Sequence, residues 1–555
     1  MLSKKNINHL KLPLMKTLLL AAATLASAAS FAQTTAHSFH QPKKAQVAIA
    51  KTPAPASFLK AASKAPEMIT EQPEGKLYKD MYGYSEGFIS QWGMIYEDVK
   101  DGVARDFVVG DDGSYYMKSP ISFQPTDSWI KGDKAEGDTI VFKLPQQIYT
   151  LDYGDGNPIK YYASRMVYQQ IDGENQYVID EKSQDIKFVW RNDSLIKCEN
   201  DVLLGMSSEA GSWNGLGDLV SVTSICPFVN EAPKDMSKVS KYIFSFHPSE
   251  RTTTQRISQV VIEGDDFYAD NIDANIPEAW IHGKIKDGKV VFSGAQFLGL
   301  DKNASQYRFN FPANVYYDEE TYMTEYKTLD DVSFDYDAAT GNLSNCKYGF
   351  MSNYGYRLIA LNMQVMMQPT FEVWDGIVAR PQNPNVMQYV PAETSSGWVI
   401  FDLPRNNVEN SFMDQSNVYY NIYFDDELAT FYPDQYLGIE EEMTDVPVDF
   451  NDTQRYDFQS FGSQHRVVIY DSGIARVGVR AVYVNGDERL YSDIVYSDGS
   501  VVTGIKNASA DAKTMSVTYY DLGGRKVQNP KHGLFIKKTV MSDGKVKTGK
   551  INKNN

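Results

Sequence analysis

Short hydrophobic stretches, either alternating with polar residues or rich in aromatic residues, follow one another between Lys76 and Pro369. They are separated by Gly, Asp and Asn turns, such as residues 110–113 and 172–175, which is the pattern of β-hairpins. No run in this region keeps apolar residues at helical spacing beyond a turn or two. The pattern predicts an all-β fold of tandem β-sandwich or β-barrel-like units, with a β-propeller-like arrangement as the alternative.

One stretch of this region occurs twice, over residues 108–146 and 260–296. Each copy holds Trp-Ile-x-Gly, then a turn with Gly, then a β-branched strand that reaches a Phe. The offset between the copies is 151 at Trp129 and Trp280, and again at the turn Gly. We call the two stretches the first and the second cassette. The duplication predicts two homologous β units, residues 76–232 and 233–369.

The cassettes share Tyr, Ile, Trp and Gly, but a polar position between the Ile and the Gly differs, as Lys131 and His282 show. A shared scaffold with a varied polar position is typical of a duplicated fold unit rather than of a repeated active site. We expect Trp129 and Trp280 to be buried anchors, because large aromatic side chains dominate core packing. A pair of sugar-stacking platforms is the alternative. The varied position is expected to be exposed, and function to lie in the loops around the cassettes.

Residues 370–500 differ in character from the two repeats. Strand-like runs cover residues 398–403, 418–424 and 476–483, and the last leads to an Asn485-Gly486 turn. Strands at this rhythm predict a β-sandwich. The region resembles a fibronectin type III-like domain in its strand rhythm and in residues 419–424.

The N-terminal residues have the pattern of an export signal. Four lysines precede an apolar run over residues 18–25, and small residues follow up to Ala32. We therefore predict a signal peptide over residues 1–32 and an exported protein. The apolar run is shorter than the ~20 residues that span a membrane, and no later uncharged stretch approaches that length, so no transmembrane segment is expected in the mature chain. Residues 33–75, rich in Ala, Lys, Pro, Ser and Thr, are expected to be a flexible linker.

The C-terminal residues carry a second address. Residues 517–527 read Val-Thr-Tyr-Tyr-Asp-Leu-Gly-Gly-Arg-Lys-Val; a Gly-Leu-Phe-Ile strand follows at 533–536 and a Gly hairpin with a Lys-rich strand at 543–551. This pattern resembles the C-terminal sorting domain of type IX secretion substrates of the Bacteroidota. The resemblance implies a small β-sandwich over residues 512–555, after a linker at 501–511, with the type IX secretion machinery as partner and the cell surface or the medium as destination. The cassettes also resemble modules of uncharacterised secreted proteins of that phylum, which implies no particular chemistry.

Charge and length narrow the class of protein further. The chain has 555 residues, more than one hydrophobic core usually supports, so several domains are expected. Its net charge is −17; without the four signal lysines and the +8 of residues 512–555, the body carries −29. Such a body repels nucleic acid, which we do not expect as a partner.

Candidate catalytic patterns are weak. Residues 83–87 read Gly-Tyr-Ser-Glu-Gly and match the nucleophile elbow, but that motif needs a strand that turns sharply into a helix, and no such pattern surrounds Ser85. The sequence contains no His-Glu-x-x-His and no Cys-x-x-Cys. Paired carboxylates of a glycosidase are not recognisable in so acidic a chain. We therefore name no catalytic residue.

Two further expectations concern single residues. Asp335 and Asp337 lie in an oxygen-rich loop that could hold Ca²⁺, although a plain hairpin turn explains the loop as well, because the Glu that closes an EF-hand is missing. Cys198 and Cys346 occupy similar places in the two repeats and are expected to be two buried small residues rather than a disulfide.

Together these features predict an exported binding or adhesion protein without catalytic activity, whose ligand is a glycan or a host protein. A secreted hydrolase of polysaccharide or peptide is the alternative.

Overall fold

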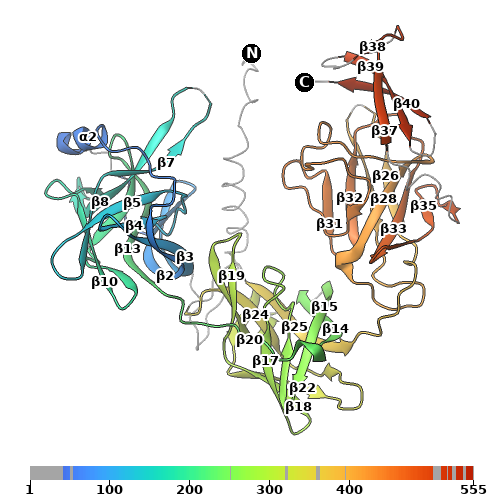
Figure 1. Cartoon of the computed structure of the whole chain (residues 1–555), viewed down its shortest axis with the longest axis horizontal. Helices are drawn as coiled ribbons and strands as arrows, with labels where there is room; N and C mark the ends of the chain where they lie inside the picture. Colours follow the sequence, from blue (N-terminus) through green and yellow to red (C-terminus); the bar gives the residue numbers. More distant parts are fainter. Residues whose placement is uncertain are drawn as a thin grey trace. The chain divides into compact units, whose positions relative to one another are not determined.

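The computed structural model describes residues 42–49, 54–154, 156–249, 252–318, 323–357, 363–393, 395–503, 514–521, 523–527, 533–541 and 546–553. Within these residues the elements are strands, apart from the seven-residue helix α2 (Ala56–Ala62) and the short 3₁₀ helices η1 (Met236–Lys238) and η2 (Gln415–Asn417). The all-β prediction is therefore confirmed. The chain divides into two compact units, Met1–Ile377 and Val378–Asn555, which Figure 1 colours from blue to yellow and from orange to red.

The first repeat is a ring of antiparallel strands with a side sheet. Its strands are β2 (Gly75–Gln91), β3 (Met94–Gly110), β4 (Ser114–Lys118), β5 (Trp129–Lys134), β6 (Thr139–Lys143), β7 (Gln146–Leu151), β8 (Ile159–Ile171), β9 (Glu174–Ile179), β10 (Asp185–Arg191), β11 (Ser194–Lys197), β12 (Val202–Ser208) and β13 (Trp213–Ser224). Pairings run in the order β2, β3, β4, β5, β6, β10, β11 and β13, and β13 returns to β2. The other four strands continue the sheet from β13 through β12 and β8. The unit is barrel-like.

The second repeat has the same topology. Its strands are β14 (Ser240–Ser249), β15 (Thr252–Glu263), β16 (Asp266–Ala269), β17 (Ile281–Lys286), β18 (Lys289–Ser293), β19 (Gln296–Asp301), β20 (Gln306–Asp318), β21 (Met323–Thr328), β22 (Asp331–Tyr336), β23 (Leu343–Ser344), β24 (Gly349–Tyr354) and β25 (Gln364–Val373). The ring runs β14, β15, β16, β17, β18, β22, β23, β25 and back to β14. Each strand thus has a counterpart in the first repeat, which confirms barrel-like units over the propeller-like alternative.

The register of the strands corrects the start of the repeat. Tyr116 pairs with Val108 and Lys131, whereas Tyr268 pairs with Val261 and His282. Val108 therefore corresponds to Val261. In the sequence analysis the second cassette began one residue earlier, at residue 260.

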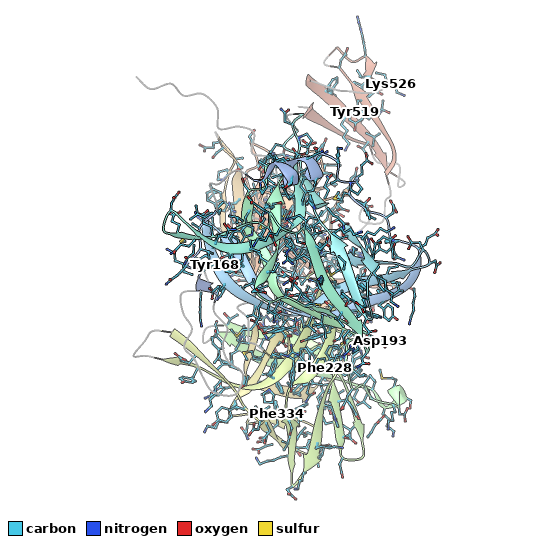
Figure 2. The ribbon with its side chains drawn as sticks, turned by 90° about the vertical axis from the view of Figure 1, so that its left-hand side faces the viewer. Tyr168, Asp193, Phe228, Phe334, Tyr519 and Lys526 are labelled. Carbon is cyan, nitrogen blue, oxygen red and sulfur yellow. The ribbon has the colours of Figure 1, made fainter. Side chains whose placement is uncertain are left out.

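Each ring encloses its own core, and the cassette Gly is part of the packing. A Cβ added at Gly283 would lie 2.8 Å from Val290 and 3.0 Å from the ring of Phe292, and Gly132 meets Ile140 and Phe142 in the same way. Both Phe side chains are fully buried (Phe334, in the same core as Phe292, is labelled in Figure 2). The Trp-Ile-x-Gly motif ends in Gly in both copies because no side chain fits between the strand and this Phe.

Part of the segment that we expected to be a flexible linker, residues 33–75, is ordered. The strand β1 (Lys43–Lys44) pairs with β3, and α2 buries Phe58 and Ala62 in a cluster with Trp213. Phe58 and Ala62 are four residues apart and therefore lie on one face of α2. This single apolar face packs on the first repeat, although the segment as a whole contains few hydrophobic residues. The linker prediction is wrong for the described residues 42–49 and 54–75. The predicted signal, residues 1–32, lies outside the described residues.

The end of the second repeat lies beyond the predicted boundary. β25 extends to Val373, which pairs with Tyr242 and so helps to close the ring. The boundary at 369 therefore cuts through a strand, because composition does not reveal which strand closes a ring.

The unit Val378–Asn555 contains a sandwich of two sheets. One sheet has the order β26 (Asn385–Val390), β27 (Gly397–Asp402), β32 (Gln464–Ile469) and β31 (Phe458–Phe461). The other has β29 (Glu427–Leu428), β28 (Val418–Phe424), β33 (Val477–Asn485), β35 (Ile494–Tyr496) and β36 (Val501–Val502), with β30 (Val446–Pro447) on β28 and β34 (Glu488–Tyr491) on β33. Phe401 of the first sheet and Tyr420 and Val479 of the second lie in one core. The sandwich predicted for residues 370–500 is present, and its fibronectin type III-like character stays a prediction.

The described residues of the C-terminal segment form one sheet, in the order β38 (Lys526–Val527), β37 (Thr514–Tyr520), β39 (Gly533–Met541) and β40 (Val546–Lys553). The small β-sandwich expected over residues 512–555 is not confirmed, because the described residues form this single sheet, and the sorting-domain assignment stays a prediction. The strand β36 occupies the start of the predicted linker 501–511, whose residues from 504 on lie outside the described residues. None of the helices in the described part of the chain is long and apolar enough to cross a membrane.

Candidate functional site

The varied polar position of each cassette is held by a glutamine side chain. Gln146, the first residue of β7, accepts a hydrogen bond from the backbone N–H of Lys131 at 2.7 Å and donates one to its carbonyl at 2.6 Å. Gln296 does the same for His282, at 2.7 and 2.8 Å. The pairing of β5 with β6 begins at Gly132, one residue after Lys131. The side-chain amide of Gln146 therefore makes the hydrogen bonds to Lys131 that a neighbouring strand would otherwise make. The sequence holds a signal for this contact that the sequence analysis missed, since both cassettes end in Gln.

A basic side chain lies over a tyrosine ring at this position in both copies. The Nζ atom of Lys131 is 5.5 Å from the centre of the Tyr116 ring and 3.0 Å from an oxygen of Asp112. The His282 ring stacks on Tyr268 with centres 4.7 Å apart and planes 12° apart. Our expectation of an exposed position is wrong for His282, whose side chain is only 20% exposed.

Two carboxylates face the two ring nitrogens of His282. Nδ1 lies 3.0 Å from Glu231, and Nε2 contacts Asp266, which also contacts Lys284. A neutral imidazole has one N–H, so only a protonated ring donates to both carboxylates at once. The hydrogen bonds from Lys284 and His282 hold the pKa of the Asp266 carboxyl below its ordinary value. The arrangement is a charged cluster on the outer surface of β16 and β17.

The segment between the repeats lies against the second cassette. The amide of Asn230 donates to the carbonyls of Trp280 and Phe297, at 2.8 and 2.7 Å, and its oxygen accepts the N–H of Trp280 at 3.0 Å. Phe228, labelled in Figure 2, packs on Phe297 and Tyr356 with ring centres 5.7 and 5.3 Å away. We call residues 226–231 the strap. Sequence reasoning missed it, because this segment reads as a connection between two domains.

A pocket of about 470 Å³ lies between the strap and strands β17 to β19. Aromatic, aliphatic and polar side chains form its walls. They belong to Phe228, Val229, Glu231, Trp280, His282, Lys284, Val291, Ser293, Ala295, Gln296, Phe297, Phe309 and Tyr356. Tyr356 is 38% exposed and Val229 is 80% exposed, so an incoming molecule can reach both. Apolar walls with a few polar groups are typical of ligand pockets.

The two cassette tryptophans are buried. Trp129 is 3% and Trp280 8% exposed, which confirms the prediction of core anchors. Trp280 is among the residues that line the pocket and Trp129 is not, and burial leaves little of either ring for a sugar to stack on.

Ser85 does not stand in a nucleophile elbow. It lies within β2, pairs with β3 and β13, and is 2% exposed. Its hydroxyl is 2.6 Å from that of Ser122, inside a buried network with Arg105 and Asp218. The Gly-x-Ser-x-Gly match is a coincidence of strand residues.

Asp335 and Asp337, the candidate ligands for Ca²⁺, both interact with donor groups of the protein itself. Asp335 pairs with Lys289 at 2.6 Å and accepts a hydrogen bond from Asn345 at 2.9 Å. Asp337 accepts the N–H of Ala339 and the hydroxyl of Thr340, as in a hairpin turn. Calcium binding there stays a prediction. Among the described residues, no group of three or more His, Cys, Asp or Glu is arranged to hold a metal ion.

The cysteines do not pair, and only one is buried. Cys346 is buried, Cys226 is half-buried and Cys198 is exposed. The expectation of two buried equivalents is therefore wrong for Cys198, because β11 ends at Lys197 and this Lys turns inward in its place.

A buried carboxylate directly after β16, within the second cassette, makes stability depend on pH. Burial raises the pKa of Asp270 to about 6, against hydrogen bonds from Gln259 that favour the charged form. The folded state therefore holds this proton more tightly than the unfolded chain, and the resulting stability is lost as pH rises through 6. We expect the free energy of unfolding, relative to Asp270→Asn, to fall by about 2 kcal/mol between pH 4 and pH 7. Urea denaturation of both proteins at the two pH values measures this; a constant difference would contradict it.

Comparison with known proteins identifies no relative: no protein-family model, curated protein or solved structure matches the chain.

Proposed function

We propose that the protein is an exported binding protein whose ligand occupies the pocket between the strap and the second cassette. The observation that carries the proposal is the pocket itself. Its volume of about 470 Å³ lies within the ~300–1,000 Å³ usual for ligand sites, and exposed aromatic surface stands beside charged groups. The backbone on both sides is held by Asn230 and Gln296, so the walls are formed before a ligand arrives.

The chemistry of the walls suits a glycan or an exposed segment of a protein. The rings of Phe228 and Tyr356 provide apolar surface, while Glu231 and Lys284 provide an acceptor and a donor at the rim. Sugars and peptides both combine apolar faces with hydroxyl or amide groups, and both are recognised in this way.

Two terminal segments support the proposal that the protein is exported. Residues 1–32 resemble a signal peptide, and residues 512–555 resemble a type IX sorting domain, so the secretion machinery is the expected partner and the cell surface or the medium the expected destination. Deletion of residues 512–555 tests this part alone. Accumulation of the truncated protein inside the cell supports the assignment, and normal arrival at the surface contradicts it.

Binding is tested with the mature chain on a glycan array and on a panel of host extracellular proteins. We expect Tyr356→Ala and Val229→Asp each to weaken binding by about tenfold or more. The first substitution removes an exposed apolar side chain from the pocket wall, and the second places a charge on it. Tyr168→Ala is the matched control, since Tyr168 is 50% exposed on β8 of the first repeat (Figure 2). Equal binding by all three variants would show that the ligand sits elsewhere.

The same preparation distinguishes binding from hydrolysis. Release of reducing ends or of cleaved peptide, lost on substitution of Glu231, would replace the proposal by the hydrolase alternative. Binding without turnover supports the proposal.

A further inference from the structure

A second, smaller pocket lies on the outer face of the sandwich in the unit Val378–Asn555. Its volume is about 110 Å³, and its lining is mostly polar: Asn421, Leu428, Thr444, Asp445, Arg480, Arg489 and Tyr491. Arg480 stands between Val479 and Ala481, both of which belong to the core. Successive strand residues point to opposite faces, so Arg480 points away from the core into this pocket.

The guanidinium of Arg480 is held in place by two tyrosine rings and one amide. Its central carbon lies 4.2 Å from the ring centre of Tyr491 and 5.3 Å from that of Tyr423. Asn421, which pairs with Arg480 across β28 and β33, accepts a hydrogen bond from its Nη2 at 2.9 Å. Arg480 is only 7% exposed. Burial lowers the pKa of this guanidinium, and the neighbouring Tyr423, Tyr491 and Asp445 oppose that effect.

A second arginine stands at the rim with one carboxylate. Nη2 of Arg489 lies 2.6 Å from Asp445, and its Nε donates to the hydroxyl of Tyr491 at 3.2 Å. The other oxygen of Asp445 accepts from Asn421 at 2.7 Å. The lining therefore carries two positive charges and one negative charge, in a protein whose net charge is −17.

These observations define a ligand class. The volume is well below the ~300 Å³ at which sites for whole small molecules begin, so only a compact group fits. Two guanidinium groups with planar forks of donors match the oxygens of a tetrahedral oxyanion. The carboxylate of Asp445 repels an ion without protons, such as sulfate, but it accepts a hydrogen bond from the P–O–H group of hydrogen phosphate, since each carboxylate oxygen has a second lone pair.

We propose that this pocket binds a phosphate group, as inorganic phosphate or as the terminal group of a phosphomonoester, between Arg480 and Arg489, with Asp445 accepting a hydrogen bond from its P–O–H group. The site is independent of the pocket at the second cassette. It belongs to a different unit of the chain and takes a different ligand.

The test uses the mature chain and isothermal titration with inorganic phosphate, sulfate and O-phosphoserine, at constant ionic strength set with NaCl. We expect saturable binding of phosphate, with sulfate at least about tenfold weaker. Binding of O-phosphoserine as well would identify the terminal group as sufficient, and its absence would identify free phosphate as the ligand. No saturable binding of either phosphate compound beyond chloride would overturn the proposal.

Variants locate the site. Arg489→Gln should weaken phosphate binding about tenfold or more, and Asp445→Asn should remove the preference for phosphate over sulfate. Arg476→Gln is the matched control: this arginine lies over the ring of Tyr496 at 4.1 Å and pairs with Asp426 and Asp498, outside the pocket. Should Arg489→Gln not fold, Arg489→Lys retains the charge without the fork, and its loss of affinity serves instead. Equal affinity of the Arg489 and Arg476 variants would overturn the assignment to this pocket.

Discussion

Asp218→Ala is expected to destabilise the first repeat by about 3–5 kcal/mol, because it leaves the charge of Arg105 buried without its carboxylate. The side chains of Arg105 and Asp218 are 2% and 0% exposed, and Nη2 lies 3.6 Å from the carboxylate oxygen. Burial raises the pKa of the Asp218 carboxyl and lowers that of Arg105, each against the attraction of the other.

Ser122 joins the two charges. Its hydroxyl accepts a hydrogen bond from Arg105 at 2.5 Å and donates to Asp218 at 2.8 Å, while its backbone N–H donates to the same carboxylate at 3.0 Å. The network connects β3, β13 and the loop before Trp129. Loss of Asp218 therefore also releases the loop that leads into the first cassette.

Chemical denaturation of the mature chain, followed by Trp fluorescence, measures the effect. Arg191→Gln is the control, since the Arg191–Asp138 pair is exposed and its loss should cost less than about 1 kcal/mol. The double variant Arg105→Met, Asp218→Leu should recover much of the stability, because no unpaired charge is left. A single variant as stable as the control would show that water reaches Arg105.

Asp273→Ala should have an effect of similar size on the second repeat, about 3–5 kcal/mol. Asp273 pairs with Nε of Arg308 at 2.5 Å, and the side chains are 1% and 2% exposed. Arg308 also lies over the ring of Tyr354, 4.4 Å from its centre, and this contact cannot replace a carboxylate.

The matched control is Lys289→Gln, which breaks the half-exposed pair with Asp335 in the same repeat and should cost less than about 1 kcal/mol. Denaturation curves of the two variants are compared under identical conditions. A midpoint for Asp273→Ala no lower than that of the control would contradict the prediction.

The two networks show how the copies diverged. Ser122 and Asp273 lie at the same place before the cassette Trp, 151 residues apart. In the first copy the loop residue, Ser122, is neutral and bridges Arg105 and Asp218, which lie on two strands. In the second copy the loop residue, Asp273, is itself the carboxylate that pairs with the arginine. Anchoring of this loop by a buried arginine is common to both.

The sequence by itself determined the class of fold, the duplication and the burial of Trp129 and Trp280, because periodicity, turn residues and repeated spacing are local properties of the chain. It also located three of the strands of residues 370–500, over 398–403, 418–424 and 476–483, and strands of the C-terminal segment. The pocket was not predictable in this way. Its walls come from the strap and from β17 to β19, and which residues meet there depends on how the ring closes.

Tertiary structure alone decided why residues of similar type have different surroundings. Lys131 and His282 are equivalent in sequence, but only His282 lies under a strap that brings Glu231 to its ring. Arg480 and Arg476 lie four residues apart near one strand, and only Arg480 is covered by Tyr423 and Tyr491. Burial and charge pairing arise from contacts between distant segments, and no local pattern encodes them.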